Sequence, residues 1–131
     1  EAIIANRYEV MAKYATELRA ACGAELDRLK AQGGENTARV KQMLIAKRWL
    51  HRDQDKIPAE LRDSVAQAAA SSAALTTLVA KREELRQLWT RTNVSAEQLV
   101  ADLQAWCRQA EDSGIAALRD FSMKLRAAKI A

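Results

Sequence analysis

The stretch Trp106 to Phe121, WCRQAEDSGIAALRDF, decides the fold, because it holds two amphipathic segments and the break between them. Apolar residues recur every three or four positions on both sides of the break, as they do along one face of an α-helix. They are Leu99, Leu103, Trp106, Cys107 and Ala110 before it, and Ile115, Leu118, Phe121, Leu125 and Ala128 after it. Ser113-Gly114 ends the first segment, since glycine readily takes the left-handed conformation that closes a helix. The stretch predicts a helix-turn-helix corner with Trp106 and Phe121 as its bulky core residues.

The same spacing predicts three more helices before this corner. The first runs from Ile4 through Leu29 and ends at Gly33-Gly34, where two flexible residues raise the entropy cost of remaining helical. The second is capped by Asn36 or Thr37 and closes at His51. Its apolar face is formed by Val40, Met43, Leu44 and Leu50, with Ile45 and Trp49 at the edge.

The third helix begins near Pro58, whose fixed φ suits a first helical turn, and ends at Thr92-Asn93. It is about eight turns long if it continues unbroken through the small residues of VAQAAASSAA. Ser95 then caps the next helix, with Gln98 three residues later in the capping-box pattern.

Five amphipathic helices with short connections can bury their apolar faces only against each other. The predicted fold is therefore all-α, an antiparallel bundle of four to five helices with two long ones, the first and the third. Residues 1–131 are predicted to form a single domain. Because the sequence begins at Glu1 without Met or a signal region, this domain is expected to be excised from a longer protein. An alternative packing uses the third helix as a coiled-coil arm that pairs with a second copy.

Composition excludes few functions. No window approaches the roughly 18 consecutive apolar residues of a membrane-spanning helix, so a membrane span is not expected. Cys22 and Cys107 lie far apart and are predicted to be reduced and buried. The net charge of +4 permits binding to nucleic acid or anionic lipid without requiring it.

No catalytic, cofactor-binding or metal-binding residue is predicted. His51 is the one histidine, and Arg48 stands three residues before it, so the Glu-x-x-His pair of di-iron bundles is missing and a zinc site lacks partners. The acidic residues around the corner are expected to be solvated because helical spacing directs several of them away from Trp106. These are Asp102, Glu111, Asp112 and Asp120.

Basic residues of the second and third helices could follow phosphates. They are Lys41, Lys47, Arg48 and Arg52 in the second helix, and Lys81, Arg82 and Arg86 in the third. Acids are interspersed at Asp53, Asp55 and Glu83-Glu84, which lowers the field that phosphate binding needs. The pattern favours a solvated surface of mixed charge over a nucleic-acid site.

Three stretches resemble the C-terminal helical tail of bacterial membrane fatty-acid desaturases: IIANRYEVMAKYATEL, LRQLW and LVADLQAWCRQAEDSGIAALRDFSMKL. A closely similar region occurs in a family of insertion-sequence transposases. The resemblance spans nearly the whole chain, and its motif is L-x-x-W-C-x-x-A-E-x-S-G-I-x-x-L-x-x-F. The motif falls on Leu103, Trp106, Cys107, Ala110, Glu111, Ser113, Gly114, Ile115, Leu118 and Phe121.

The desaturase resemblance implies a parent enzyme that introduces a double bond into a fatty acyl chain with a di-iron centre held by histidine clusters. Those histidines are not in this sequence, so the resemblance gives this fragment no cofactor and no catalytic residue. The fragment would be a soluble tail on the cytoplasmic face of the membrane, serving assembly or docking. Its partners would be the rest of the desaturase chain and, through the long helices, a second copy, with no nucleic acid favoured.

The transposase resemblance implies a different parent. In that family the helical region accompanies a nuclease core whose acidic residues bind metal, and the chain would handle DNA. We favour the desaturase because the sequence ends at Ala131 in a short basic helix with no nuclease segment after it, and because the basic residues form no continuous stripe. A generic helical oligomerisation module remains a third hypothesis.

Overall fold

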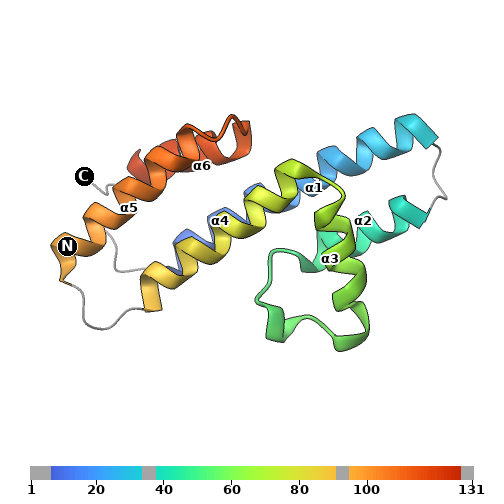
Figure 1. The fold of residues 1–131 in the computed structure, drawn as a ribbon, viewed down its shortest axis with the longest axis horizontal. Helices are drawn as coiled ribbons and strands as arrows, with labels where there is room; N and C mark the ends of the chain where they lie inside the picture. The colour runs from blue at the N-terminus through green and yellow to red at the C-terminus, as the bar shows by residue number, and fades with distance from the viewer. Residues whose placement is uncertain (1–6, 34–37, 91–94, 128–131) are drawn as a thin grey trace. The chain divides into compact units, whose positions relative to one another are not determined.

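The computed structural model describes residues 7–33, 38–90 and 95–127, and all the regular structure in these residues is helical. This confirms the predicted all-α fold class (Figure 1). Two 3-10 helices, η2 (Gln54–Lys56) and η3 (Ala59–Leu61), lie between α2 and α3. The α-helices are α1 (Arg7–Gly33), α2 (Ala38–Trp49), α3 (Arg62–Ala70), α4 (Ala73–Thr90), α5 (Ala96–Glu111) and α6 (Ala116–Ala127).

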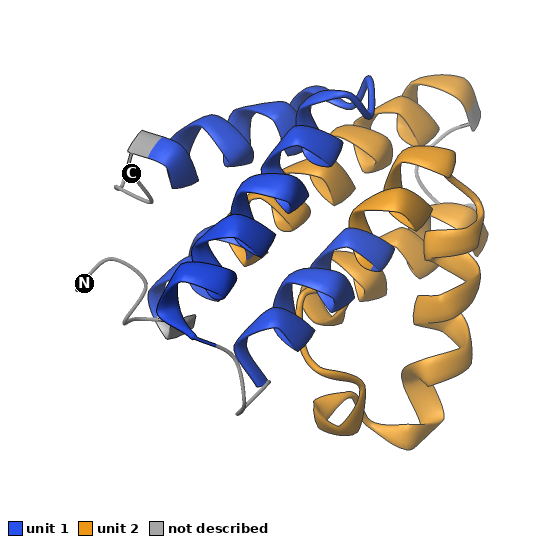
Figure 2. Ribbon diagram, turned by 60° about the vertical axis from the view of Figure 1, so that its left-hand side comes forward, with its two compact units in different colours: residues 1–14, 80–131 blue, residues 15–79 orange. Residues whose placement is uncertain are grey.

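The helices form two compact units (Figure 2). Unit 1 comprises Glu1–Tyr14 and Ala80–Ala131, and within it α5 and α6 pack together. Unit 2 comprises Ala15–Val79, and within it α2 packs against α3. Since the boundaries fall inside α1 and α4, both of these helices contribute residues to each unit. That the chain unfolds as a single domain stays a prediction.

The core of unit 1 is an aromatic cluster at the predicted corner. Tyr14, Trp106 and Phe121 are buried and meet edge to face, with ring centroids 4.9 Å apart for Tyr14 and Phe121 and 5.7 Å apart for Trp106 and Phe121. The Trp106 indole Nε1 donates a hydrogen bond to the Lys81 carbonyl oxygen at 3.1 Å. Edge-to-face contact brings the positive ring edge of one aromatic to the negative face of the next. The prediction that Trp106 and Phe121 are core residues is confirmed.

Helix α5 begins and ends where the sequence predicts. The Ser95 hydroxyl oxygen accepts a hydrogen bond from the Gln98 backbone nitrogen at 3.0 Å, which satisfies one of the free N–H groups of the first turn. The Gln98 side chain donates to Asp102 at 2.9 Å. After Glu111, Gly114 has φ +80°, the left-handed conformation that lets the chain turn into α6.

Glu111 corrects the expectation that the corner acids are solvated. Its carboxylate accepts hydrogen bonds from the Ser122 hydroxyl and from Arg126 Nε, both at 2.7 Å, and so joins α5 to α6. These bonds, that of Arg126 foremost, hold the Glu111 pKa below its usual range. Asp112 and Asp120 are exposed, as predicted.

The predicted third helix is divided into α3 and α4. The Ser71 hydroxyl donates to the Ala68 carbonyl oxygen at 2.7 Å, and the Ser72 hydroxyl accepts from the Leu75 backbone nitrogen at 3.2 Å. Serine hydroxyls that bond to nearby backbone groups compete with the helical ladder, and Ser72 thereby caps α4. The condition for an eight-turn helix, that it continues unbroken, is therefore not met, because the two serines end α3 and begin α4 within a run of strong helix formers.

The buried face of helix α2 agrees with the predicted one except at Leu44. Val40, Met43 and Leu50 are buried as expected. Leu44 is 48% exposed, and Ala46, which was not predicted for this face, is buried.

The first helix ends at Gly33, in agreement with the sequence. The other predicted boundary and core positions fall outside the described residues: Ile4, Gly34, Asn36, Thr37, Thr92, Asn93 and Ala128.

Gly114→Ala and Gly23→Ala are expected to change stability in opposite directions. Gly114 has a positive φ, so alanine there should cost about 1–2 kcal/mol in the left-handed region. Gly23 lies inside α1, where a new Cβ would stand 3.6 Å from Lys47 Nζ, an ordinary contact. Alanine there should add about 0.5–1 kcal/mol, because glycine loses more chain entropy on folding. Urea denaturation of both variants checks this, and destabilisation by Gly23→Ala would contradict it.

Candidate nucleic-acid interface

The net positive charge of the chain comes from one segment. Residues 38–52, which comprise α2 and the three residues after it, contain five Lys and Arg residues and no Asp or Glu. Since the whole chain has 21 Lys and Arg against 17 Asp and Glu, the rest of it carries 16 basic and 17 acidic residues. The net charge of +4 therefore originates in this segment. Its basic residues are Arg39, Lys41, Lys47, Arg48 and Arg52.

Part of this charge lies on the exposed side of α2. Lys41, Leu44 and Arg48 follow at three- and four-residue spacing, so they share a side of the helix, and all three are exposed. Arg52 lies just beyond the helix end, and its guanidinium carbon is 5.7 Å from the centre of the Trp49 ring. The Arg48 guanidinium carbon lies at the same distance from that ring. We call Lys41, Leu44, Arg48 and Arg52 the basic face.

The cations of the basic face have no carboxylate partner among the described residues, whereas those of α4 and α6 do. Lys81 pairs with Glu84 at 3.0 Å, Arg86 with Glu83 at 2.5 Å and Arg126 with Glu111 at 2.7 Å. The mixed-charge surface predicted from the sequence thus describes α4 and not α2. Asp53 and Asp55 follow α2 in the chain and do not interrupt it.

Lys47 belongs to a different side of α2. Its Nζ lies 3.6 Å from the position that a Cβ on Gly23 would occupy, so its side chain lies over α1 within unit 2. Next to Gly23, burial raises the pKa of the Cys22 thiol to about 11, even though the Lys47 charge opposes the shift. Cys22 is therefore a neutral thiol near neutral pH, which agrees with its predicted role as a core residue.

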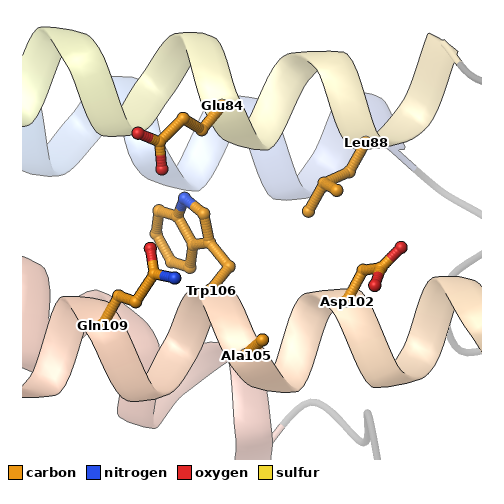
Figure 3. A pocket seen from close by; sticks show the side chains of 6 residues that line it. All are labelled: Glu84, Leu88, Asp102, Ala105, Trp106 and Gln109. Carbon is orange, nitrogen blue, oxygen red and sulfur yellow. The ribbon is translucent and has the colours of Figure 1, made fainter.

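Unit 1 contains a pocket of about 260 Å³ beside Trp106 (Figure 3). Glu84 and Leu88 of α4 face Asp102, Ala105 and Gln109 of α5 across it, with the Trp106 indole between the two helices. Lys81 Nζ donates to Glu84 at 3.0 Å and to Gln109 at 2.5 Å at the edge. Carboxylates on both sides make this pocket unfavourable for a phosphate group.

The remaining predicted features concern thiols, metals and membranes. Cys22 and Cys107 are free and buried, as predicted. Within residues 7–33, 38–90 and 95–127, no three His, Cys, Asp or Glu side chains are grouped closely enough to hold a metal ion. No described helix has the length and apolar character to cross a membrane. That the chain has no catalytic, metal or cofactor site stays a prediction.

The comparison with protein families assigns the chain to a family. A model of a transposase family, the ISL3 type of DDE transposases, matches residues 1–130. The chain belongs to this transposase family. No curated protein and no solved structure matches the chain.

The family membership shows that the desaturase assignment was wrong. The motif that suggested it consists largely of core residues, among them Leu103, Trp106, Leu118 and Phe121. Such residues are determined by the packing of the two helices, so a match in them says little about the function of a protein. The desaturase partner, the parent's di-iron centre and the membrane-face location rested on that assignment and are withdrawn. The preference against nucleic acid is also corrected, because transposases act on DNA.

Proposed function

We propose that this chain is a helical, non-catalytic part of a DDE transposase and that it contacts DNA during transposition. The observation that carries the proposal is the family match over residues 1–130. The charge distribution supports it, because residues 38–52 carry five basic groups and no acid. Strand cleavage and joining would be performed by acidic residues of the nuclease core that accompanies this helical region.

Binding of the chain to labelled duplex DNA tests the first part of the proposal. We expect the logarithm of the binding constant to fall linearly with the logarithm of salt concentration between about 50 and 200 mM, because each neutralised phosphate releases condensed counterions. Fluorescence anisotropy of the labelled duplex measures this. No binding at the lowest salt concentration would overturn DNA contact as the function.

Incubation of the chain with supercoiled plasmid and Mg²⁺ or Mn²⁺ tests the second part. We expect the plasmid to remain intact, because two-metal strand cleavage needs carboxylates gathered around the ions, and the described residues offer no such group. Gel electrophoresis separates nicked from supercoiled plasmid. Metal-dependent nicking by the chain alone, absent when EDTA is added, would show that it holds catalytic residues of its own.

A further inference from the structure

We propose that the basic face of α2, formed by Lys41, Leu44, Arg48 and Arg52, is the surface through which the chain holds DNA, and that it contacts the phosphate backbone without reading base sequence. The inference rests on the proposed function and adds the surface and the mode of recognition.

The first argument is charge complementarity. All three cations of the basic face are exposed, and none has a carboxylate partner in the part of the chain that the structure describes. An unpaired cation can exchange its water and counterions for a phosphate without first breaking an ion pair. The cations of α4 and α6 lack this property, since Lys81, Arg86 and Arg126 are held by carboxylates. The cations of the basic face are therefore better placed to bind phosphates than these three.

The second argument is spacing. Lys41 and Arg48 are seven residues apart on α2, which corresponds to a rise of about 10 Å. Phosphates of one DNA strand recur about every 3.4 Å along the duplex axis, so the two side chains can contact phosphates about three steps apart. Arg48 and Arg52 have planar guanidinium groups, which can bind phosphate oxygens in a bidentate manner. Leu44 lies between the charged residues and offers apolar contact to the sugars.

The third argument concerns specificity. Base sequence is read through hydrogen bonds and apolar contacts to base edges, for which Asn and Gln are the usual partners of adenine and Arg and Lys those of guanine. The basic face has no amide side chain. Gln42 on α2, next to Lys41 in the sequence, donates a hydrogen bond from its Nε2 to Gln67 Oε1 of α3 at 2.8 Å. Arg48 and Arg52 are both held against the Trp49 ring at the end of the helix. With both guanidinium groups against the Trp49 ring, this arrangement favours contact with the phosphate backbone over contact with base edges.

Single charge-removing variants test the surface. We expect Lys41→Gln and Arg48→Gln each to reduce the salt slope of binding by about 0.9, the value for one phosphate contact, and the double variant by about 1.8. Each variant should weaken binding by the same factor for duplexes of unrelated sequence. Arg48→Lys keeps the charge and should keep the slope. Fluorescence anisotropy of the labelled duplexes gives the slopes, and far-UV circular dichroism confirms that each variant is folded.

Arg28→Gln is the matched control, because it removes the same charge from unit 2. Arg28 is exposed, but it is paired with Glu25. Its loss should leave the salt slope unchanged. If Lys41→Gln and Arg48→Gln also leave it unchanged while the unmodified chain binds DNA, the basic face is not the contact surface and the proposed function survives. If the unmodified chain does not bind, the proposed function itself fails. Weakening confined to one duplex sequence would overturn the claim that bases are not read.

Discussion

Trp106→Ala is expected to lower the free energy of unfolding by about 3–5 kcal/mol, the range for deleting a buried aromatic side chain. Trp106 is 3% exposed and meets both other rings of the aromatic cluster edge to face. The substitution removes those contacts and leaves a cavity that the surrounding helices can only partly fill. It also removes the hydrogen bond that the indole donates to the Lys81 carbonyl oxygen, typically worth about 1 kcal/mol.

Urea denaturation followed by far-UV circular dichroism measures this loss. Met123→Ala is the matched control in the same unit, because Met123 on α6 is 59% exposed. Its effect should stay within about 0.5 kcal/mol, as is usual for surface substitutions. A loss below about 1 kcal/mol for Trp106→Ala would show that the aromatic cluster does not hold unit 1 together.

Met43→Ala is expected to cost about 2–5 kcal/mol, and Leu44→Ala, one residue further along, almost nothing. Met43 is 1% exposed within unit 2, whereas Leu44 is 48% exposed. The pair tests the register of α2 directly, because the sequence alone assigns both residues to the core. The same urea titrations provide the measurement. Equal losses for the two variants would mean that Leu44 is covered in the folded protein.

The two destabilising variants also test the single-domain prediction. If residues 1–131 unfold as one cooperative unit, Trp106→Ala and Met43→Ala should move the same transition, and tryptophan fluorescence and circular dichroism should follow it together. Two separate transitions, each shifted by only one of the variants, would show that units 1 and 2 unfold independently.

Much of the fold can be predicted from the sequence because its boundaries have local causes. Ser95 caps a helix with its own hydroxyl, and Gly114 takes a conformation that other residues avoid. The break at Ser71-Ser72 is not visible in apolar periodicity, because it comes from hydroxyl groups bonding to nearby backbone atoms.

Leu44 shows a second limit of periodicity. An assignment from apolar periodicity places any large apolar residue near the three- or four-residue helical spacing in the core. The register of α2 buries the small Ala46 instead, in line with Val40 and Met43. Hydrophobicity indicates which side chains favour burial, but the direction in which each side chain projects from the helix determines which of them are buried.

The candidate site was partly visible in the sequence. Lys41, Arg48 and Arg52 stood out as basic residues, but Asp53 and Asp55 were weighed with them although they follow the helix. A charge count over α2 alone would have found Arg39, Lys41, Lys47 and Arg48 without an acid, although it would also have left out Arg52. The ion pairs that neutralise Arg86 and Arg126 depend on the folded arrangement of their side chains. The pair of Arg126 with Glu111 joins two helices, so residue spacing alone did not reveal it.

The concentration of surplus charge in residues 38–52 has a consequence for diffusion. A molecule whose positive potential originates at one helix experiences a torque as it approaches a polyanion, so productive orientations are favoured before any atoms touch. This guidance reaches about 10 Å at 0.1 M ionic strength and roughly three times further at 0.01 M. The rate of encounter with DNA, and not only the lifetime of the complex, should therefore depend on α2.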